Sequence, residues 1–539
     1  YFAFAVFLVF ALVRLLTRNI LLSFLTGLLF LIHPTNNEVV NWVSTVPELT
    51  FTIFSLLSAI FYVSWRQAVP KSKEKSRSLL QKPALKIASP YSSLASLARR
   101  RALTPRFFRQ VFSASLLLQK HKKLFLAAIF YLLAMLSKEP AVLLPAAFAL
   151  YDVSSAKNAL GKFFSVRELA RYVPFLAAFC LYLAMRINVL GGIGQGGDYH
   201  GSFSLAERIY AFVTLFGQYA GKLLYPYPLL FYYPFTKESN FWSFPFLLSI
   251  LAVFAFFAAL FFAWKRKKAV FNLFLAWIIL FLLPVLLWVD SVGENVFSER
   301  YLFASSIGFA FLLASGFAYM LKRKEKIWRK SALVLLGVGL VLSWMVIYPR
   351  NRIFHDDFAL YRATIKQNPE ASSLRRNLAV ELGDIGQYDE ALKELHEILN
   401  RNPQWREIDK VYNNLGGVYR AMGDFDQALY YYEKFAQVAS SDNFQPANNI
   451  GATLFEKGQY VQSLLYTCKA MQINPKAVEP QFNLNRLSLL FDSVNEGGTN
   501  LLYQDVVNGG VFAESSEERI RYEKKECGQE SCVFSFGSR

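Results

Sequence analysis

Four short stretches with ionisable side chains interrupt the apolar first part of this 539-residue chain. These stretches are HPTNNEVVNWVSTVPEL (33–49), SKEP (137–140), the loop 188–208 with its continuation 219–234, and DSVGENVFSERYLFASSIGF (290–309). Charges beside membrane-length apolar segments are costly unless they lie at an interface or serve a site. One such stretch is explained as an interfacial cap, because Glu suits a helix start and Lys or Arg snorkels. Four of them on one face indicate a functional site.

The chain has two parts of different composition. Residues 1–349 contain 37 Lys/Arg against 13 Asp/Glu, and residues 350–539 contain 21 against 26. The basic residues of the first part cluster in loops that flank apolar segments, which is typical of cytoplasmic loops of a membrane protein. This distribution argues against a nucleic-acid partner, for which the positive charge would follow one surface.

The apolar runs predict about ten transmembrane spans, since roughly 20 apolar residues cross a bilayer and somewhat fewer suffice with snorkelling flanks. They lie near 1–13, 19–33, 49–65, 124–137, 140–152, 172–186, 244–264, 269–289, 301–321 and 331–348. Tyr1 lies inside an apolar run, so we expect an N-terminal piece with a further span to precede it. The predicted fold is therefore all-α, with a polytopic membrane domain over residues 1–349.

The positive-inside rule orients these spans. Loop 66–123 holds fifteen Lys/Arg against the single Glu74, and the basic runs 265–268 and 322–324 follow two later spans. If all three are cytoplasmic, then 34–48, 187–243, 290–300 and everything after Tyr348 are extracytoplasmic. This assignment requires segment 205–240 to lie along the outer face or to dip into it, rather than to cross.

The polar part of the chain contains an internal repeat. Three similar units lie near 377–403, 414–440 and 449–475, within a repeat domain spanning 350–490. Each has a small residue at a helix crossing and then a Gly turn, and the pattern resembles the tetratricopeptide repeat. We expect 356–367 to form a leading half-unit, 477–490 a closing helix, and Tyr412, Tyr419 and Tyr430–Tyr432 to pack between repeats. The tail 491–539 has no helical period from Glu496 onward, and it is expected to be disordered or to form a loose cap.

The polar stretches, together with LLAMLSKEPAVLLPAAFALYD and NRIFHDDFALYRATIKQNP, resemble the transmembrane and tetratricopeptide O-mannosyltransferases and their bacterial relatives. That family belongs to the fold type C (GT-C) glycosyltransferases, which use polyprenyl-phosphate sugars. The resemblance implies an enzyme that transfers a sugar, mannose by expectation, from a membrane lipid donor to an acceptor protein held by the repeats. It implies no further cofactor, and the sequence shows no metal-ligand cluster.

The resemblance also implies roles for the outward-facing residues. Lys138 and Arg300, with Lys222 or Arg186, would hold the donor phosphate, and His33 would donate to the phosphate or the acceptor. Glu139 and Glu299 would orient the adjacent cations. The acceptor hydroxyl needs a carboxylate base, which in this family lies in the first outer loop and is expected upstream of Tyr1. Glu38 and Asp198 are weaker candidates for the base.

Two other functions fit the same sequence. One is a non-catalytic membrane scaffold that assembles proteins through its repeats, and the other is an oligosaccharide ligase or polymerase using lipid-diphosphate donors. Only about three repeats are present, which favours a bacterial relative in the inner membrane over an endoplasmic reticulum protein and leaves the sugar identity open. In either membrane the repeats are expected outside the cytoplasm.

Overall fold

The computed structural model describes residues 1–68, 105–155, 165–190, 203–233, 240–289 and 295–495, and this part of the chain is helical without strands. The predicted all-α class is therefore confirmed for the described residues. The chain divides into two compact units, the first spanning Tyr1–His355 and the second beginning at Asp356. The helix that contains the expected span 331–348 is longer than that span, because it begins at Lys326 and continues through Pro349 to Ile353.

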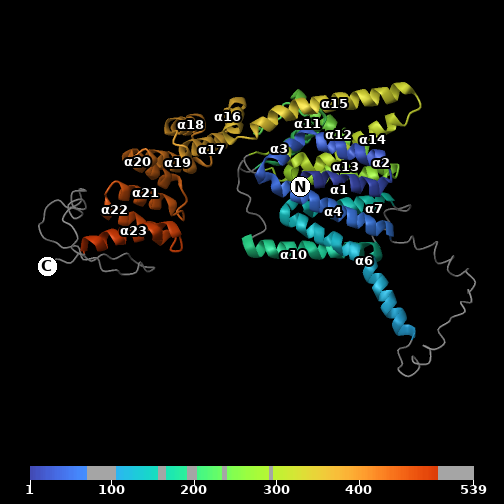
Figure 1. The fold of residues 1–539 in the computed structure, drawn as a ribbon, viewed down its shortest axis with the longest axis horizontal. Coiled ribbons are helices and arrows are strands. Elements are labelled where there is room, and N and C mark those ends of the chain that lie inside the picture. Colours follow the sequence, from blue (N-terminus) through green and yellow to red (C-terminus); the bar gives the residue numbers. More distant parts are fainter. Residues whose placement is uncertain (69–104, 156–164, 191–202, 234–239, 290–294, 496–539) are drawn as a thin grey trace, which may run out of the picture. The chain divides into compact units, whose positions relative to one another are not determined.

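The first unit is a bundle of apolar helices joined by short 3₁₀ turns. Its helices are α1 (Phe2–Thr17), α2 (Ile20–Ile32), α3 (Asn37–Asn41), α4 (Val46–Ala68), α6 (Pro105–Ser137), α7 (Leu144–Ser155), α9 (Val166–Leu169), α10 (Val173–Leu190), α11 (Leu205–Leu224), α12 (Phe244–Lys265), α13 (Ala269–Leu287), α14 (Leu302–Leu321) and α15 (Lys326–Ile353). The 3₁₀ turns are η1 (Pro34–Asn36), η2 (Val43–Thr45), η4 (Glu139–Leu143), η5 (Ala170–Tyr172) and η6 (Glu299–Tyr301). Helices α1, α2, α4, α13 and α14 gather at the centre of this unit (Figure 1).

Six of these helices are long and apolar enough to cross a membrane, judged by length and composition over the described residues. They are Val43–Ala68, Ala170–Val189, Phe244–Lys265, Ala269–Leu287, Glu299–Leu321 and Lys326–Ile353, and they coincide with six of the ten expected spans. A bent pair, Ile20–Ile32 and Pro34–Asn41 at 57°, would make a seventh. The remaining expected spans fall on α1, α6 and α7, of which α1 has 16 residues and α7 has 12. The total of ten remains a prediction.

Helix α11 corresponds to the segment that we expected to lie along one face. Near its start, Tyr210 stacks on Phe246 of the first turn of α12, with ring centroids 4.8 Å apart. At its end, the Leu223 carbonyl lies 3.0 Å from Nε2 of His33, directly after α2. Both partners belong to segments that we expect at the extracytoplasmic ends of their helices. In its middle, α11 contacts α12, where the ring centroids of Phe216 and Phe256 lie 5.4 Å apart. That α11 lies along one face of the membrane therefore remains a prediction, and so does the side.

A close crossing of α13 and α14 holds the centre of the bundle together. The Trp277 indole donates to the Ala304 carbonyl at 3.0 Å, and a Cβ added at Gly308 would meet the Phe274 carbonyl and lie 2.6 Å from Cγ1 of Ile278. Real Cβ atoms do not approach backbone so closely, so glycine is required here for the two helices to touch.

Changing Gly308→Ala should therefore destabilise the first unit by about 1–3 kcal/mol, the usual cost of overpacking. The matched control is Gly316→Ala on the same helix, where an added Cβ meets no described atom within 4 Å. Alanine favours a helix over glycine, so this control should be neutral or slightly stabilising. Melting temperatures of the full chain in detergent compare the two, and equal melting temperatures would contradict the packing argument.

The second unit is a series of antiparallel helix pairs. Its helices are α16 (Asp357–Gln367), α17 (Ser372–Asp384), α18 (Tyr388–Arg401), α19 (Ile408–Ala421), α20 (Phe425–Val438), α21 (Gln445–Glu456), α22 (Tyr460–Ile473) and α23 (Val478–Asn495). The three predicted Gly turns, at Gly386, Gly423 and Gly458, each have a positive φ between 79° and 83°. This left-handed conformation is easily adopted only by glycine, which explains why the turn residue recurs.

The small residues of the repeats lie where helices cross. A Cβ at Gly416 would lie 2.6 Å from the ring of Tyr432, which is 2% exposed between α19 and α20. Tyr419 stacks on Tyr431 with a centroid distance of 5.4 Å, whereas Tyr430 is 51% exposed. The predicted packing role therefore holds for Tyr432 and is wrong for Tyr430, because adjacent helix positions face different directions.

Candidate functional site

Two of the predicted cations, Lys138 and Arg300, line one pocket in the first unit. The pocket is lined by Glu48, Phe51, Thr52, Lys138, Pro140, Phe281, Arg300, Tyr301, Phe303 and Ala304. These residues come from α4, η4, α13, η6 and α14, so the pocket lies where separate helices end or begin. Lys138 has extended backbone angles between α6 and η4, and Pro140 stands at the start of η4. Proline cannot continue the preceding helix, and the break keeps the lysine at the helix junction.

Lys138 is held by a carboxylate from another helix. Its Nζ donates to Oε1 of Glu48 at 2.5 Å, and it lies 4.8 Å from the ring centroid of Tyr301. The Lys138 side chain is 20% exposed and that of Glu48 is 9% exposed. Burial lowers the pKa of Lys138; the nearby Arg300 acts in the same direction, and Glu48 opposes both. A partly buried ammonium ion of this kind is suited to binding an anion inside the pocket.

Arg300 approaches a carboxylate that is more deeply buried. Its Nη1 lies 4.0 Å from Oε1 of Glu38, which is 1% exposed and accepts a hydrogen bond from Ser298 Oγ at 3.3 Å. The guanidinium also lies over Trp42 and Tyr301, 5.7 Å and 5.6 Å from their ring centroids. Because the ion pair with Glu38 is long, the arginine keeps capacity to bind an anion.

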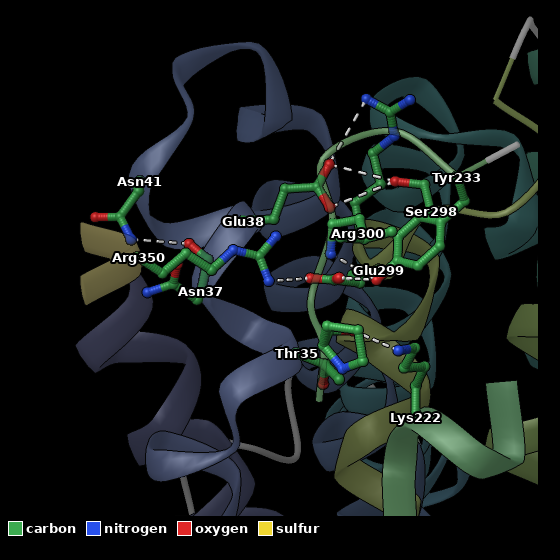
Figure 2. A network of polar contacts seen from close by, with 12 residues as sticks. Thr35, Asn37, Glu38, Asn41, Lys222, Tyr233, Ser298, Glu299, Arg300 and Arg350 are labelled. Atoms are coloured by element: carbon green, nitrogen blue, oxygen red, sulfur yellow. Dashed lines mark hydrogen bonds and ion pairs between the residues drawn. The ribbon is translucent and has the colours of Figure 1, made fainter. Parts of the chain in front are cut away.

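Glu299 forms a second buried network beside the pocket. It is fully buried, accepts a hydrogen bond from the Tyr233 hydroxyl, and pairs with Nη1 of Arg350 at 2.5 Å. Figure 2 shows the carboxylates of Glu38 and Glu299 close together, with arginines on either side. Glu299 therefore pairs with an arginine from α15, and not with the adjacent Arg300 as we expected.

The other predicted phosphate ligand, Lys222, is not among the described residues that line the pocket. Its Nζ donates to the Pro228 carbonyl and lies 5.5 Å from the ring centroid of Tyr233 (Figure 2). Burial lowers the pKa of Lys222, and the charge of Glu299 opposes this effect. Lys222 thus belongs to the edge of the Glu299 network.

His33 and Glu139 also have partners outside the pocket. The His33 ring lies 2.7 Å from Thr35 Oγ1 through Nδ1 and contacts α11 through Nε2. Glu139 pairs with Arg186 at 2.9 Å, and not directly with Lys138 beside it. Asp198 lies outside the described residues. The structure therefore brings together Lys138 and Arg300, and gives His33 and Glu139 contacts with neighbouring helices.

Three residues at the site were missed by sequence reasoning. Glu48 lies in the first turn of α4, Tyr301 follows Arg300 directly, and Arg350 lies beyond the expected span 331–348. The Glu48–Lys138 pair joins residues 90 positions apart, and the Glu299–Arg350 pair joins residues 51 positions apart. No local sequence pattern can therefore indicate these pairs. Among the described residues, no group of three or more His, Cys, Asp or Glu could hold a metal ion.

Comparison with known proteins agrees with the repeat assignment. A tetratricopeptide repeat model matches residues 369–441. The second unit contains tetratricopeptide repeats.

Two curated relatives are named O-mannosyl-transferases, and both are from Drosophila melanogaster. Protein O-mannosyl-transferase Tmtc1 is 31% identical over 110 residues, and Protein O-mannosyl-transferase Tmtc3 is 27% identical over 118 residues. These segments cover 20% and 22% of this chain, and the chain covers only 13% of the length of each relative. The similarity to O-mannosyl-transferases is therefore partial.

Proposed function

We propose that this chain is an integral membrane glycosyltransferase that moves a sugar from a polyprenyl-phosphate donor to Ser or Thr hydroxyls of a protein. The proposed sugar is mannose, and the proposed site faces the extracytoplasmic side. The observation that carries this proposal is the shared pocket of Lys138 and Arg300 at a junction of apolar helices. The partial similarity to two proteins named O-mannosyl-transferases supports the same reaction.

In this reaction the acceptor hydroxyl oxygen bonds to the anomeric carbon of the sugar, and the bond from that carbon to the donor phosphate oxygen breaks. The electron pair leaves with the polyprenyl phosphate, which departs as an anion, and the hydroxyl proton goes to a base. Lys138 and Arg300 would stabilise the negative charge that develops on the phosphate. Fixed cations in a partly buried site stabilise such a charge more strongly than water does. Tyr301 between them packs against both cations.

We assign no base from these residues. Glu38 is turned toward Ser298 and Arg300, and Glu48, which does line the pocket, is paired with Lys138. A carboxylate engaged in this way would have to give up its cation before accepting a proton. The proposal therefore covers donor binding and leaving-group stabilisation.

The repeats are proposed to hold the acceptor protein, since stacked helix pairs form extended surfaces for peptides. Full-length protein in nanodiscs, given polyprenyl-phosphate mannose labelled in the sugar and a Ser/Thr-rich acceptor, should transfer the label to the acceptor. Absence of transfer while the acceptor still binds would contradict the proposal and favour the membrane scaffold. Transfer from a lipid-diphosphate donor only would favour the ligase or polymerase.

Donor binding should weaken at alkaline pH. Only the protonated amine of Lys138 attracts a phosphate, and burial lowers its pKa from the usual 10.5. As the pH rises through this lowered pKa, the charge is lost and the KM for the donor should rise. Lys138→Arg should remove this pH dependence, because a guanidinium stays charged throughout. KM measured from pH 7 to 10 tests the prediction, and identical profiles for both proteins would contradict it.

A further inference from the structure

The last turn of α15 is the part of this helix that enters the polar network of the site. Of the 28 residues of α15, all of which the structure describes, only Ala332 and Arg350 are buried. Most of the helix presents exposed apolar side chains, as expected of a helix that faces lipid. In Figure 1 it runs along one side of the first unit as a single long helix. Its polar attachment is therefore concentrated near its C-terminal end.

Arg350 is a buried arginine that forms an ion pair with one residue of the described part of the chain. Its Nη1 donates to Glu299 at 2.5 Å, with the two side chains 8% and 0% exposed. Its Nη2 is also buried and has no hydrogen-bond partner among the described residues. A buried charge is costly unless it is paired, so the pair fixes both residues. Glu299 directly precedes Arg300 in η6, and holding one holds the turn that carries the other.

Asn351 attaches the same turn to α3. Its Oδ1 accepts hydrogen bonds from the side-chain amides of Asn37 at 2.5 Å and Asn41 at 2.9 Å. These donors lie one helical turn apart and Asn37 is buried, so one side-chain oxygen of α15 joins two positions of α3. Helix α3 carries Glu38, the carboxylate that faces Arg300.

Aromatic contacts continue from this turn to the pocket. The ring of Phe354, at the end of α15, lies 6.0 Å from that of Phe231, which lies 4.6 Å from Trp42. Trp42 in turn lies under the Arg300 guanidinium. Arg350 and Asn351 of α15 thus contact η6 and α3, the two elements that surround Arg300. Phe354, directly after the helix, reaches Trp42 through Phe231.

We infer that Arg350 is a positioning residue for donor binding: by holding Glu299 it fixes the turn that presents Arg300 to the donor phosphate, with Asn351 and Phe354 fixing α3 and Trp42. This inference rests on the proposed function, because it concerns the same pocket. It goes further because it assigns a role in donor binding to the last turn of α15, which does not line the pocket. Only three residues, 354–356, separate this turn from α16, the first helix of the repeat unit.

The test compares Arg350→Gln with Arg352→Gln in the full-length protein in nanodiscs. Arg352 lies on the same turn but is exposed, and it contacts Tyr348 of its own helix. Misplacing a binding group typically costs tenfold or more, so R350Q should raise the KM for polyprenyl-phosphate mannose about tenfold. The acceptor KM of R350Q, and both KM values of R352Q, should stay within about twofold of wild type.

A structural role alone would lower the melting temperature of R350Q without changing the donor KM of the folded fraction, and that result overturns the inference. If R350Q does not fold, Asn351→Ala tests the same turn from its exposed side, with an expected rise in donor KM of about threefold. An unchanged donor KM in N351A would then overturn the inference. If the wild-type protein transfers no sugar, the proposed function fails. Equilibrium binding of decaprenyl phosphate then tests the positioning role. Weaker binding to R350Q than to R352Q supports it, and equal binding overturns it.

Discussion

Replacing Lys138 or Arg300 by glutamine is expected to reduce sugar transfer by at least about 100-fold, because each change removes a cation from the leaving phosphate. Both side chains line the same pocket and both lie beside Tyr301. The K138Q variant also leaves Glu48 without its ion-pair partner, so its stability should fall as well. Initial rates with labelled polyprenyl-phosphate mannose measure the loss, and melting temperatures separate it from unfolding.

The matched control for this prediction is Lys122→Gln. Lys122 is an exposed lysine on α6, the helix that ends next to Lys138. The K122Q variant should transfer sugar at the wild-type rate, because an exposed lysine on a helix surface has little influence on a distant anion. Equal losses in K122Q and K138Q would show that net charge, and not the pocket, governs the reaction. A folded R300Q variant with wild-type activity would remove Arg300 from the proposed donor site.

The second large effect is expected on stability, at a polar cluster around Asp152. This aspartate is 4% exposed and accepts hydrogen bonds from Tyr62 at 2.7 Å, Arg66 at 2.9 Å and Tyr172 at 3.3 Å. Arg171 lies 3.9 Å away as a second cation. Removing one partner of a buried ion pair costs about 3–5 kcal/mol, since the remaining charge is left uncompensated. Asp152→Asn should therefore lower the melting temperature of the full chain by about 5–10 °C.

Glu168→Gln provides the control for this cluster. Glu168 pairs with Arg171 one turn away on the same segment, and its side chain is 28% exposed. Partly exposed pairs of this kind contribute less than about 1 kcal/mol, so E168Q should melt close to wild type. If D152N and E168Q melt alike, the buried carboxylate does not hold α4 and α7 together in the way that its contacts indicate.

Sequence reasoning succeeded best in the repeat unit. Each of the three predicted units overlaps one helix pair of α17 to α22, although each begins inside the first helix of its pair. The turn glycines were identified from the repeat pattern, and they have the expected left-handed conformation. Each repeat is specified by contacts within itself and with its neighbours, so local periodicity carries nearly all of the information. The exception is Tyr430, where the run of three tyrosines concealed which of them faces the core.

The first unit was harder to predict in detail. Its apolar segments were found, but the helices that contain them can be longer, and α15 extends beyond the expected span 331–348 at both ends and contains Pro349. Proline disfavours a helix interior without forbidding it when other contacts hold the chain. Here Arg350 and Asn351 supply such contacts directly after Pro349. Helix ends in this unit therefore depend on tertiary partners as much as on local signals.

By itself, the sequence determined the helical class, the apolar segments of the first part that are candidates to cross a membrane, and the repeats of the second part. It also gave a short set of ionisable residues as candidates for a site. Only the tertiary structure decided how those residues pair. It placed Glu48 with Lys138, brought Arg350 to Glu299, and left Lys222 outside the described lining of the pocket. The physical reason is that helix formation follows local periodicity, whereas an ion pair in a bundle joins side chains far apart in the chain.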